Sequence, residues 1–404
     1  MMPHNTLVHK KDTGWISYIC HKLLNAMNIE EKVNSEFERR FGAEGTTYAS
    51  AGRINLIGEH TDYNGGFVFP GAIDKVIVAR LRANCTDRVH LYAADLDETA
   101  SFGLEEADAP ASQWARYVFG VCREIIKRGG HVGGFDAVFA GNVPLGAGLS
   151  SSAALESVFA FALNDMFNNG EINPMTLARI GQDTEHHYCG VKCGIMDQFA
   201  SVFGRRGQLM RLDCRSMEYE YYPFNPEGYR LVLIDSVVKH ELVDSPYNRR
   251  RESCERVAAA LGVDTLRDAT MEMLETARPT LSDEDYRRAR YVIGEKERVL
   301  TVCDALRRDD YDTVGRMMYE THAGLRDDYE VSCEELDFLN DVARECGVTG
   351  SRIMGGGFGG CTINLVSDKL YDTFIDTVAR KFEDRYGHAP KIYDVVISDG
   401  ARRL

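Results

Sequence analysis

Long apolar runs are missing from this chain of 404 residues. Nowhere do about 18 apolar residues follow one another, which is the length that a membrane-spanning helix needs. The N-terminal segment MMPHNTLVHKKDTGWISYIC also lacks the apolar core of a signal peptide. The sequence therefore predicts a cytoplasmic protein that does not contact membranes.

Positive charge is scarce relative to negative charge. The formal net charge is −15, which repels nucleic acid and anionic membranes at long range. The basic run Arg249 to Arg251 is short, and because Glu252 and Glu255 follow it, we interpret it as a solvated helix face. The expected partners are small molecules.

Paired cysteine motifs are absent as well. The cysteines number 11 and are scattered from Cys20 to Cys361, so a cytosolic protein would keep them as thiols. Residues 185–193 (EHHYCGVKC) gather possible zinc ligands, but their spacing matches neither Cys-x2-Cys nor His-Glu-x2-His, and no second pair follows. This spacing disfavours a zinc site.

Neither repeats nor low-complexity segments interrupt the chain. Its length suggests two domains, because single cores stop growing near about 250 to 300 residues. Apolar spacing predicts strands over 75–83, 89–93, 135–140, 208–214, 218–224, 229–235 and 362–366. It predicts helices over 30–41, 114–127, 153–167, 174–187, 245–261, 283–307, 311–325, 334–346 and 370–386. The shift towards helix places a boundary near residue 215 in an α/β (α+β) protein.

The stretch from Gly52 to Pro70 joins two short apolar alternations through a glycine-rich turn. The turn carries the polar side chains of Glu59, His60, Asp62 and Asn64. Carboxylate, imidazole and amide groups suit a ligand dense in hydroxyls, such as a sugar. The alternative is a hairpin whose polar groups cap its own backbone.

A glycine- and serine-rich loop separates the strand 135–140 from the helix 153–167. Its sequence, GNVPLGAGLSSSAAL over 141–155, places backbone amides at a helix N-terminus, where they can bind phosphate. It contains no Gly-Lys-Ser/Thr and lacks the third glycine of a dinucleotide fingerprint. A tight turn with a serine cap is the alternative.

Two acidic side chains stand out farther along the chain. Glu185 lies in the last turn of a helix that begins at Asn173-Pro174, where a carboxylate opposes the helix dipole unless a cation compensates. Asp197 lies in CGIMDQF, and an ordinary helix N-cap or first-turn aspartate is its alternative role.

A glycine-rich segment follows near the end of the chain. Five glycines within Gly355 to Gly360 indicate a close approach of the backbone to another group.

Together these motifs resemble the galactokinases of the GHMP small-molecule kinase superfamily. GRINLIGEHTDYNGG, PLGAGLSSSAA, CGIMDQF and the glycine segment occur in the expected order, and the resemblance runs from about residue 45 to the ending SDGARRL. Met354 stands where the family usually has threonine. The resemblance implies a two-domain GHMP kinase fold with the active site in the cleft between a sugar- and ATP-binding domain (1–215) and a C-terminal GHMP domain (216–404). This boundary is approximate, because the resemblance leaves open whether the last strand returns to the first domain.

The resemblance also implies an activity: ATP-dependent phosphorylation of the anomeric hydroxyl of α-D-galactose. The residues expected to bind the sugar are Arg53, Glu59, His60, Asp62, Gly194, Asp197 and Tyr247. Those expected to bind ATP are Pro144, Gly146, Gly148, Leu149, Ser150, Ser151, Ser152 and Ala153, with Gly356 and Gly357 as a backbone lid. Mg2+ would be held by Ser152 and Glu185.

Catalysis would rest on Asp197, which orients the hydroxyl and accepts its proton late, beside Arg53, which keeps that carboxylate ionised. Trp114 and Tyr117, at positions i and i+3 of one helix, could form a wall for adenine, and core packing is the alternative. For Tyr247 the alternative is an aromatic packed at the start of a helix.

Two other functions compete with this one. A kinase for N-acetylgalactosamine or another alcohol is disfavoured by the uninterrupted EHTDYN at residues 59–64, and a catalytically weak galactose sensor is disfavoured by Ser152-Ala153. We expect a monomer or weak homo-oligomer.

Overall fold

The computed structural model of the chain describes residues 28–238 and 246–404. Residues 1–27 and the first residue of the helix predicted over 245–261 lie outside the described residues. Within the described ranges, none of the helices combines the length and apolar character of a bilayer-spanning segment.

The strands of the described ranges form three sheets. In chain order they are β1 (Thr46–Asn55), β2 (Phe67–Val68), β3 (Pro70–Ala83), β4 (Arg88–Ala93), β5 (Glu98–Gly103), β6 (Phe135–Gly141), β7 (Gln208–Asp213), β8 (Tyr219–Pro223), β9 (Tyr229–Asp235), β10 (Gly350–Ile353), β11 (Cys361–Ser367), β12 (Lys391–Val395) and β13 (Arg402–Arg403). The largest sheet has the order β13-β1-β3-β6-β4-β5, the second β10-β11-β9-β12 and the third β2-β7-β8.

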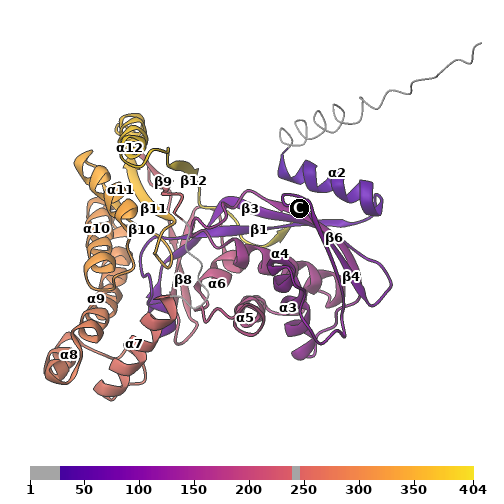
Figure 1. The fold of residues 1–404 in the computed structure, drawn as a ribbon, viewed down its shortest axis with the longest axis horizontal. Coiled ribbons are helices and arrows are strands. Elements are labelled where there is room, and N and C mark those ends of the chain that lie inside the picture. Colours follow the sequence, from indigo (N-terminus) through magenta and orange to yellow (C-terminus); the bar gives the residue numbers. More distant parts are fainter. Residues whose placement is uncertain (1–27, 239–245) are drawn as a thin grey trace, which may run out of the picture.

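Helices surround these sheets (Figure 1). They are α2 (Ile29–Phe41), α3 (Gln113–Lys127), α4 (Ser151–Phe167), α5 (Pro174–Thr184), α6 (Met196–Phe203), α7 (Pro246–Leu261), α8 (Met271–Ala277), α9 (Asp283–Leu306), α10 (Tyr311–Asp327), α11 (Glu334–Glu345) and α12 (Tyr371–Tyr386).

The six-stranded sheet carries helices on both faces (Figure 1). Side chains alternate along its strands, so that Val78 and Val138 point towards α2, where they meet Val33 and Phe37. Their neighbours, such as Ala79, point to the opposite face, which α3 and α4 cover. Burial on both faces explains why β6 is apolar along most of its length.

The C-terminal half contains the four-stranded sheet and most of the longer helices. Val232 and Ile234 of β9 pack against Phe374 of α12 and Leu339 of α11, whereas Leu233 faces a core cluster that also contains residues of the N-terminal half. Because this cluster is continuous across the halves, they pack directly against each other. The boundary near residue 215 stays a prediction.

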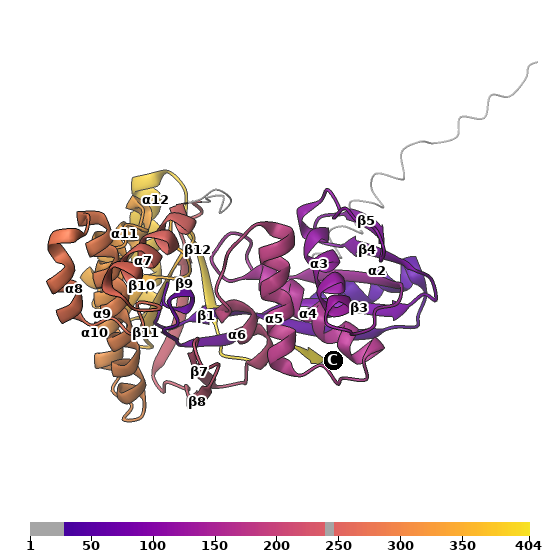
Figure 2. The ribbon, with the colours of Figure 1, turned by 90° about the horizontal axis from the view of Figure 1, so that it is seen from below.

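The chain ends in the half where it begins. After β12, the C-terminal segment runs back along the N-terminal half, and β13 pairs antiparallel with β1 (Figure 2). The register joins Tyr48 to Arg403 and Ala49 to Arg402. The last residues of the chain therefore form one edge strand of the six-stranded sheet.

Helix ends differ from the sequence-based expectations at two functional positions. The helix predicted from residue 153 begins at Ser151, so the serines of the loop form its first turn. The helix predicted to reach residue 187 is α-helical only to Thr184 and continues as a π-helical turn over Glu185–Cys189. Such turns widen the backbone and occur often at functional sites.

The interpretation of Arg249 to Arg251 as a solvated face is wrong for Arg250. This residue is buried, its Nε–H donates to the Tyr329 carbonyl at 2.9 Å, and its Nη2 donates to the Glu330 carbonyl. Both carbonyls belong to the segment that follows α10, so Arg250 anchors that segment to α7 through buried backbone oxygens that need a donor.

Candidate active site

The motifs singled out in the sequence meet around one cavity of about 250 Å³. The predicted residues that line it are Arg53, Glu59, His60, Asp62, Pro144, Gly146, Gly148, Leu149, Ser150, Ser151, Ser152, Glu185, Gly194, Asp197, Tyr247, Gly356 and Gly357. Ala153, Trp114 and Tyr117 do not line it. Residues from both halves of the chain therefore face a common space.

In the polar turn between β1 and β2, some side chains stabilise the turn and others line the cavity. Thr61 donates to the Gly58 carbonyl at 2.9 Å, and Asn64 donates to the His60 carbonyl at 2.9 Å, so these two support the turn itself. His60, with a φ of 63°, lines the cavity together with Glu59 and Asp62. A positive φ at a residue other than glycine is costly, and it is often found at functional sites.

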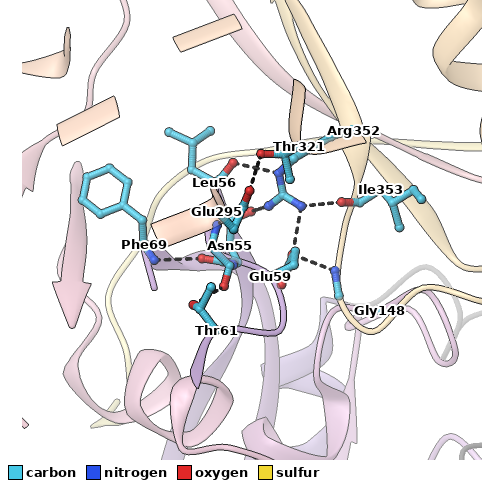
Figure 3. A network of polar contacts seen from close by, with 12 residues as sticks. Asn55, Leu56, Glu59, Thr61, Phe69, Gly148, Glu295, Thr321, Arg352 and Ile353 are labelled. Carbon is cyan, nitrogen blue, oxygen red and sulfur yellow. Dashed lines mark hydrogen bonds and ion pairs between the residues drawn. The ribbon is translucent and has the colours of Figure 1, made fainter. Parts of the chain in front are cut away.

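Glu59 is held from behind by a buried arginine (Figure 3). Arg352 of β10 is fully buried, and its Nη1 lies 3.0 Å from Glu59 Oε1, which also accepts the Gly355 N–H at 2.8 Å. The same guanidinium donates to the carbonyls of Asn55, Leu56 and Ile353. Glu59 thus links the polar turn between β1 and β2, which is called the sugar turn below after the ligand expected from the sequence, to the C-terminal half.

A second buried carboxylate supports the turn from the same side. Glu295 of α9 accepts the Gly58 N–H at 2.8 Å through Oε1, and its Oε2 accepts from Thr321 at 2.8 Å and from Arg298 at 2.6 Å. Both oxygens are therefore satisfied without water. The turn is fixed by charged groups that the sequence analysis did not single out.

Asp197 lies in the first turn of α6, but its carboxylate does not cap the helix. Arg53 of β1 donates through Nε to Oδ1 at 2.7 Å and through Nη2 to Oδ2 at 2.9 Å. Ser150 donates to Oδ2, and the remaining guanidinium nitrogen of Arg53 donates to the Gly148 carbonyl. The ion pair is therefore tied to the phosphate loop at two points.

The phosphate loop and the late glycine segment face each other. A Cβ added at Gly148 would lie 3.1 Å from the Met354 carbonyl, and one at Gly355 would lie 3.4 Å from the Gly148 carbonyl. Residues larger than glycine at these two positions would therefore push the two loops apart. Together with the first turn of α4, they line the cavity with backbone and serine hydroxyls, the groups that bind phosphate at helix N-termini.

Glu185 occupies the start of the π-helical turn and accepts the Ser152 hydroxyl at 2.8 Å. Burial raises its pKa to about 7, and the Asp197 charge acts in the same direction. A buried carboxylate and a hydroxyl on one side of a cavity are oxygen donors of the kind that Mg2+ prefers.

Gly194 forms the cavity wall against Asp62. A Cβ there would lie 1.8 Å from Asp62 Oδ2, so any larger residue would displace that carboxylate. Burial raises the pKa of Asp62 to about 7, with the charges of Asp197 and Glu59 adding to the effect. Asp62 and Glu185 thus both titrate close to neutral pH.

Tyr247 closes the cavity over His60. The ring centroids of these residues lie 5.3 Å apart, and Tyr247 also packs edge-on against Tyr63 at 5.6 Å. Tyr247 therefore packs at the start of α7 and also lines the cavity, and its contact with a sugar stays a prediction.

Trp114 and Tyr117 pack against the core of the N-terminal half. Trp114 donates to Glu98 at 2.7 Å, and its ring lies 5.5 Å from that of Phe139. Their role as an adenine wall stays a prediction.

The possible zinc ligands within residues 185–193 make contacts with protein groups instead. His186 contacts the Cys193 carbonyl at 2.8 Å and His187 contacts Glu124 at 2.9 Å. Across residues 28–238 and 246–404, no group of three or more His, Cys, Asp or Glu side chains is arranged to hold a metal.

Several lining or supporting residues were not predicted. Phe358 and Asn248 line the cavity, and Arg352 and Glu295 lie behind it. Arg352 lies in β10, just before the glycine segment, and the short sequence of this strand, GSRI, carries no signal of a buried carboxylate partner.

Comparisons with known proteins agree with this arrangement. Family models match for the galactokinase galactose-binding signature (residues 35–83), the GHMP kinases N terminal domain (116–205) and the GHMP kinases C terminal (303–384). Galactokinases of Thermotoga petrophila and Clostridium acetobutylicum are 39% and 38% identical to this chain, over 87% and 93% of it and 98% of each relative.

Solved structures give the same result. Lactococcus lactis galactokinase, solved with galactose, superposes with a TM-score of 0.88 at 32% identity, covering 92% of this chain and 98% of that one. Methanococcus jannaschii mevalonate kinase shares the fold at a TM-score of 0.63 and 16% identity, covering 88% and 99% of the two chains.

The fold and the paired glycine loops define a GHMP kinase, which confirms the two-domain fold expected from the sequence. Within that class, the chain belongs to the galactokinase family.

Proposed function

We propose that this protein transfers the γ-phosphoryl group of ATP to the anomeric hydroxyl of α-D-galactose, giving galactose 1-phosphate and ADP. The observation that carries the proposal is the Arg53–Asp197 pair, which adjoins the polar sugar turn on one side and the phosphate loop on the other. A group that contacts both regions can align a sugar hydroxyl with a phosphate.

Asp197 orients the nucleophile in this scheme. Its Oδ2 accepts from both Arg53 and Ser150, whereas Oδ1 accepts only from Arg53 and keeps a lone pair for a sugar hydroxyl. In a loose transition state the hydroxyl loses its proton late, so orientation contributes more than basicity. Arg53 stabilises the negative charge that develops nearby.

The sugar would be held by Asp62, His60, Glu59, Tyr247 and the backbone at Gly194. Glu59 has one oxygen committed to Arg352 and Gly355, so only Oε2 remains for a ligand. Asp62 is less buried than Glu59, so its carboxylate is the more accessible of the two to a ligand.

The Ser152 hydroxyl and the Glu185 carboxylate are oxygen donors that suit Mg2+. Mg2+ commonly binds one or two protein oxygens together with nucleotide phosphates, and Ser152 and Glu185 supply such oxygens beside the phosphate loop. When bound with ATP, the ion neutralises charge on the phosphates. The bond between the serine and the glutamate keeps both oxygens together.

The test is a coupled ADP-release assay across hexoses, with and without Mg2+. We expect release with galactose and Mg2+ and little with glucose or N-acetylgalactosamine. Preference for N-acetylgalactosamine would favour the sister kinase. Binding of galactose and ATP without ADP release would contradict the proposal and favour a sensor.

A further inference from the structure

His60 is enclosed by three tyrosines. Its ring centroid lies 4.8 Å from that of Tyr329, 5.3 Å from Tyr247 and 5.9 Å from Tyr63. Burial lowers the pKa of His60 to about 3, so the imidazole is neutral at pH 7 and carries one proton. Which nitrogen carries that proton decides whether the ring offers a sugar a donor or an acceptor.

A chain of hydroxyl groups ends on this ring. His60 Nδ1 lies 2.7 Å from the Tyr63 hydroxyl, which lies 2.8 Å from the Tyr329 hydroxyl. Tyr329 is fully buried between α10 and α11, and its hydroxyl also lies 3.3 Å from Cys254 Sγ on α7. The chain thus begins in the C-terminal half and ends on the sugar turn.

The other ring nitrogen faces a different environment. Within residues 28–238 and 246–404, no group forms a hydrogen bond with His60 Nε2, although that atom is buried at the cavity wall. A proton on Nε2 would present a donor to a ligand in the cavity, and this tautomer requires Tyr63 to donate to Nδ1.

We propose that Tyr329 is a positioning residue for the sugar: through Tyr63 it holds His60 in the tautomer that presents an Nε2–H donor to one galactose hydroxyl. Each hydroxyl then donates once, Tyr329 to Tyr63 and Tyr63 to Nδ1. This inference rests on the proposed function for the identity of the ligand. The relay itself depends only on the contacts within the protein.

The first test is Tyr329→Phe, which removes one buried hydroxyl and keeps the ring. We expect the KM for galactose to rise about 3- to 10-fold, the loss of roughly one hydrogen bond, while kcat changes by less than about 2-fold. Against the four monodeoxygalactoses, the variant and the wild type should differ for three sugars and agree for the one that lacks the hydroxyl bound by His60.

The matched control is Tyr319→Phe, which removes a tyrosine hydroxyl that bonds the Val348 carbonyl at 2.9 Å outside the cavity. It should leave every KM unchanged. An unchanged KM for galactose in Tyr329→Phe, or an equal loss for all four deoxy sugars, would overturn the proposal.

The tautomer can be read in the wild-type protein, so the test survives a variant that fails to fold. Nitrogen-15 NMR of histidine-labelled protein, with His60 assigned through His60→Gln, should show a proton on Nε2. A proton on Nδ1 would overturn the relay. Absence of ADP release with galactose in the wild type would instead contradict the proposed function and leave the tautomer measurement to decide the relay.

Discussion

Glu59 and Arg352 are 293 positions apart in the sequence, yet their side chains form an ion pair at 3.0 Å in which both are almost completely buried. The arginine uses its remaining donors on backbone carbonyls that flank the same turn (Figure 3). A residue of the C-terminal half therefore determines where the sugar turn lies.

Replacing Arg352 with methionine should destabilise the protein by about 3 to 5 kcal/mol, because Glu59 would keep a buried charge without its partner. The double variant Arg352→Met/Glu59→Gln should recover part of that loss. Urea unfolding of the two single variants and the double variant measures the coupling. Additive losses, or a single-variant cost below about 1 kcal/mol, would show that the pair is not coupled.

Gly194→Ala should weaken galactose binding, because the added Cβ would lie 1.8 Å from Asp62 Oδ2. We expect the KM for galactose to rise more than about tenfold, as the displaced carboxylate loses a charged hydrogen bond. Gly190→Ala is the control: its φ is +74° but its Cβ meets open space, so it should cost only about 1 kcal/mol of stability. Steady-state kinetics on both variants decide between the two effects, and a normal KM in Gly194→Ala would contradict the expected contact.

The sequence was informative where function requires a residue type within a short segment. The hydroxyl-binding turn, the phosphate loop and Asp197 are local patterns, and their resemblance to one family implied that they converge. The helix and strand positions followed from apolar periodicity, because each element buries a definite face.

Residues that act through distant partners could not be predicted in the same way. Nothing near Arg352 or Glu295 in the sequence indicates that each would bind the sugar turn, since their partners lie more than about 200 positions away. The π-helical turn at Glu185 was missed for a related reason: its residues, EHHYC, directly continue α5 and carry no pattern that distinguishes a π-helical turn from another turn of α-helix.

Asp197→Asn should fold and bind galactose while losing phosphoryl transfer by about a thousandfold or more. The amide keeps the size of the carboxylate, but it cannot accept from Arg53 on both atoms or orient a hydroxyl with negative charge. Calorimetric titration with galactose should give near-normal affinity, and the ADP-release assay should give the loss of turnover. Turnover within tenfold of the wild type would remove Asp197 from the mechanism.

Glu185→Gln should raise the Mg2+ concentration needed for half-maximal turnover by about 10- to 100-fold, because a neutral amide replaces the charged oxygen beside Ser152. Galactose affinity without nucleotide should not change. Glu171→Gln, a neutral substitution at an exposed site, controls for the change in net charge. Equal Mg2+ requirements in Glu185→Gln and the wild type would exclude Glu185 as a ligand.

Asp62 should make galactose binding depend on pH near neutrality. Its pKa is raised from 3.8 to about 7, mainly by burial, so the carboxyl becomes protonated as the pH falls below about 7 and then accepts fewer hydrogen bonds from the sugar. The KM for galactose should therefore rise as the pH is lowered from 8 to 6, whereas Asp62→Asn should have a high KM that varies less with pH.

The stability of the folded protein should depend on the ionisation of Asp62 in the opposite sense. A carboxyl whose pKa is raised by folding favours the folded state below its unfolded pKa, and this contribution is lost as the pH rises through about 7. Asp62→Asn should therefore be more stable than the wild type by about 2 to 4 kcal/mol above pH 7, and the difference should shrink towards pH 4. Urea unfolding of both proteins across this range measures the difference, and one that stays constant with pH would show that Asp62 ionises normally.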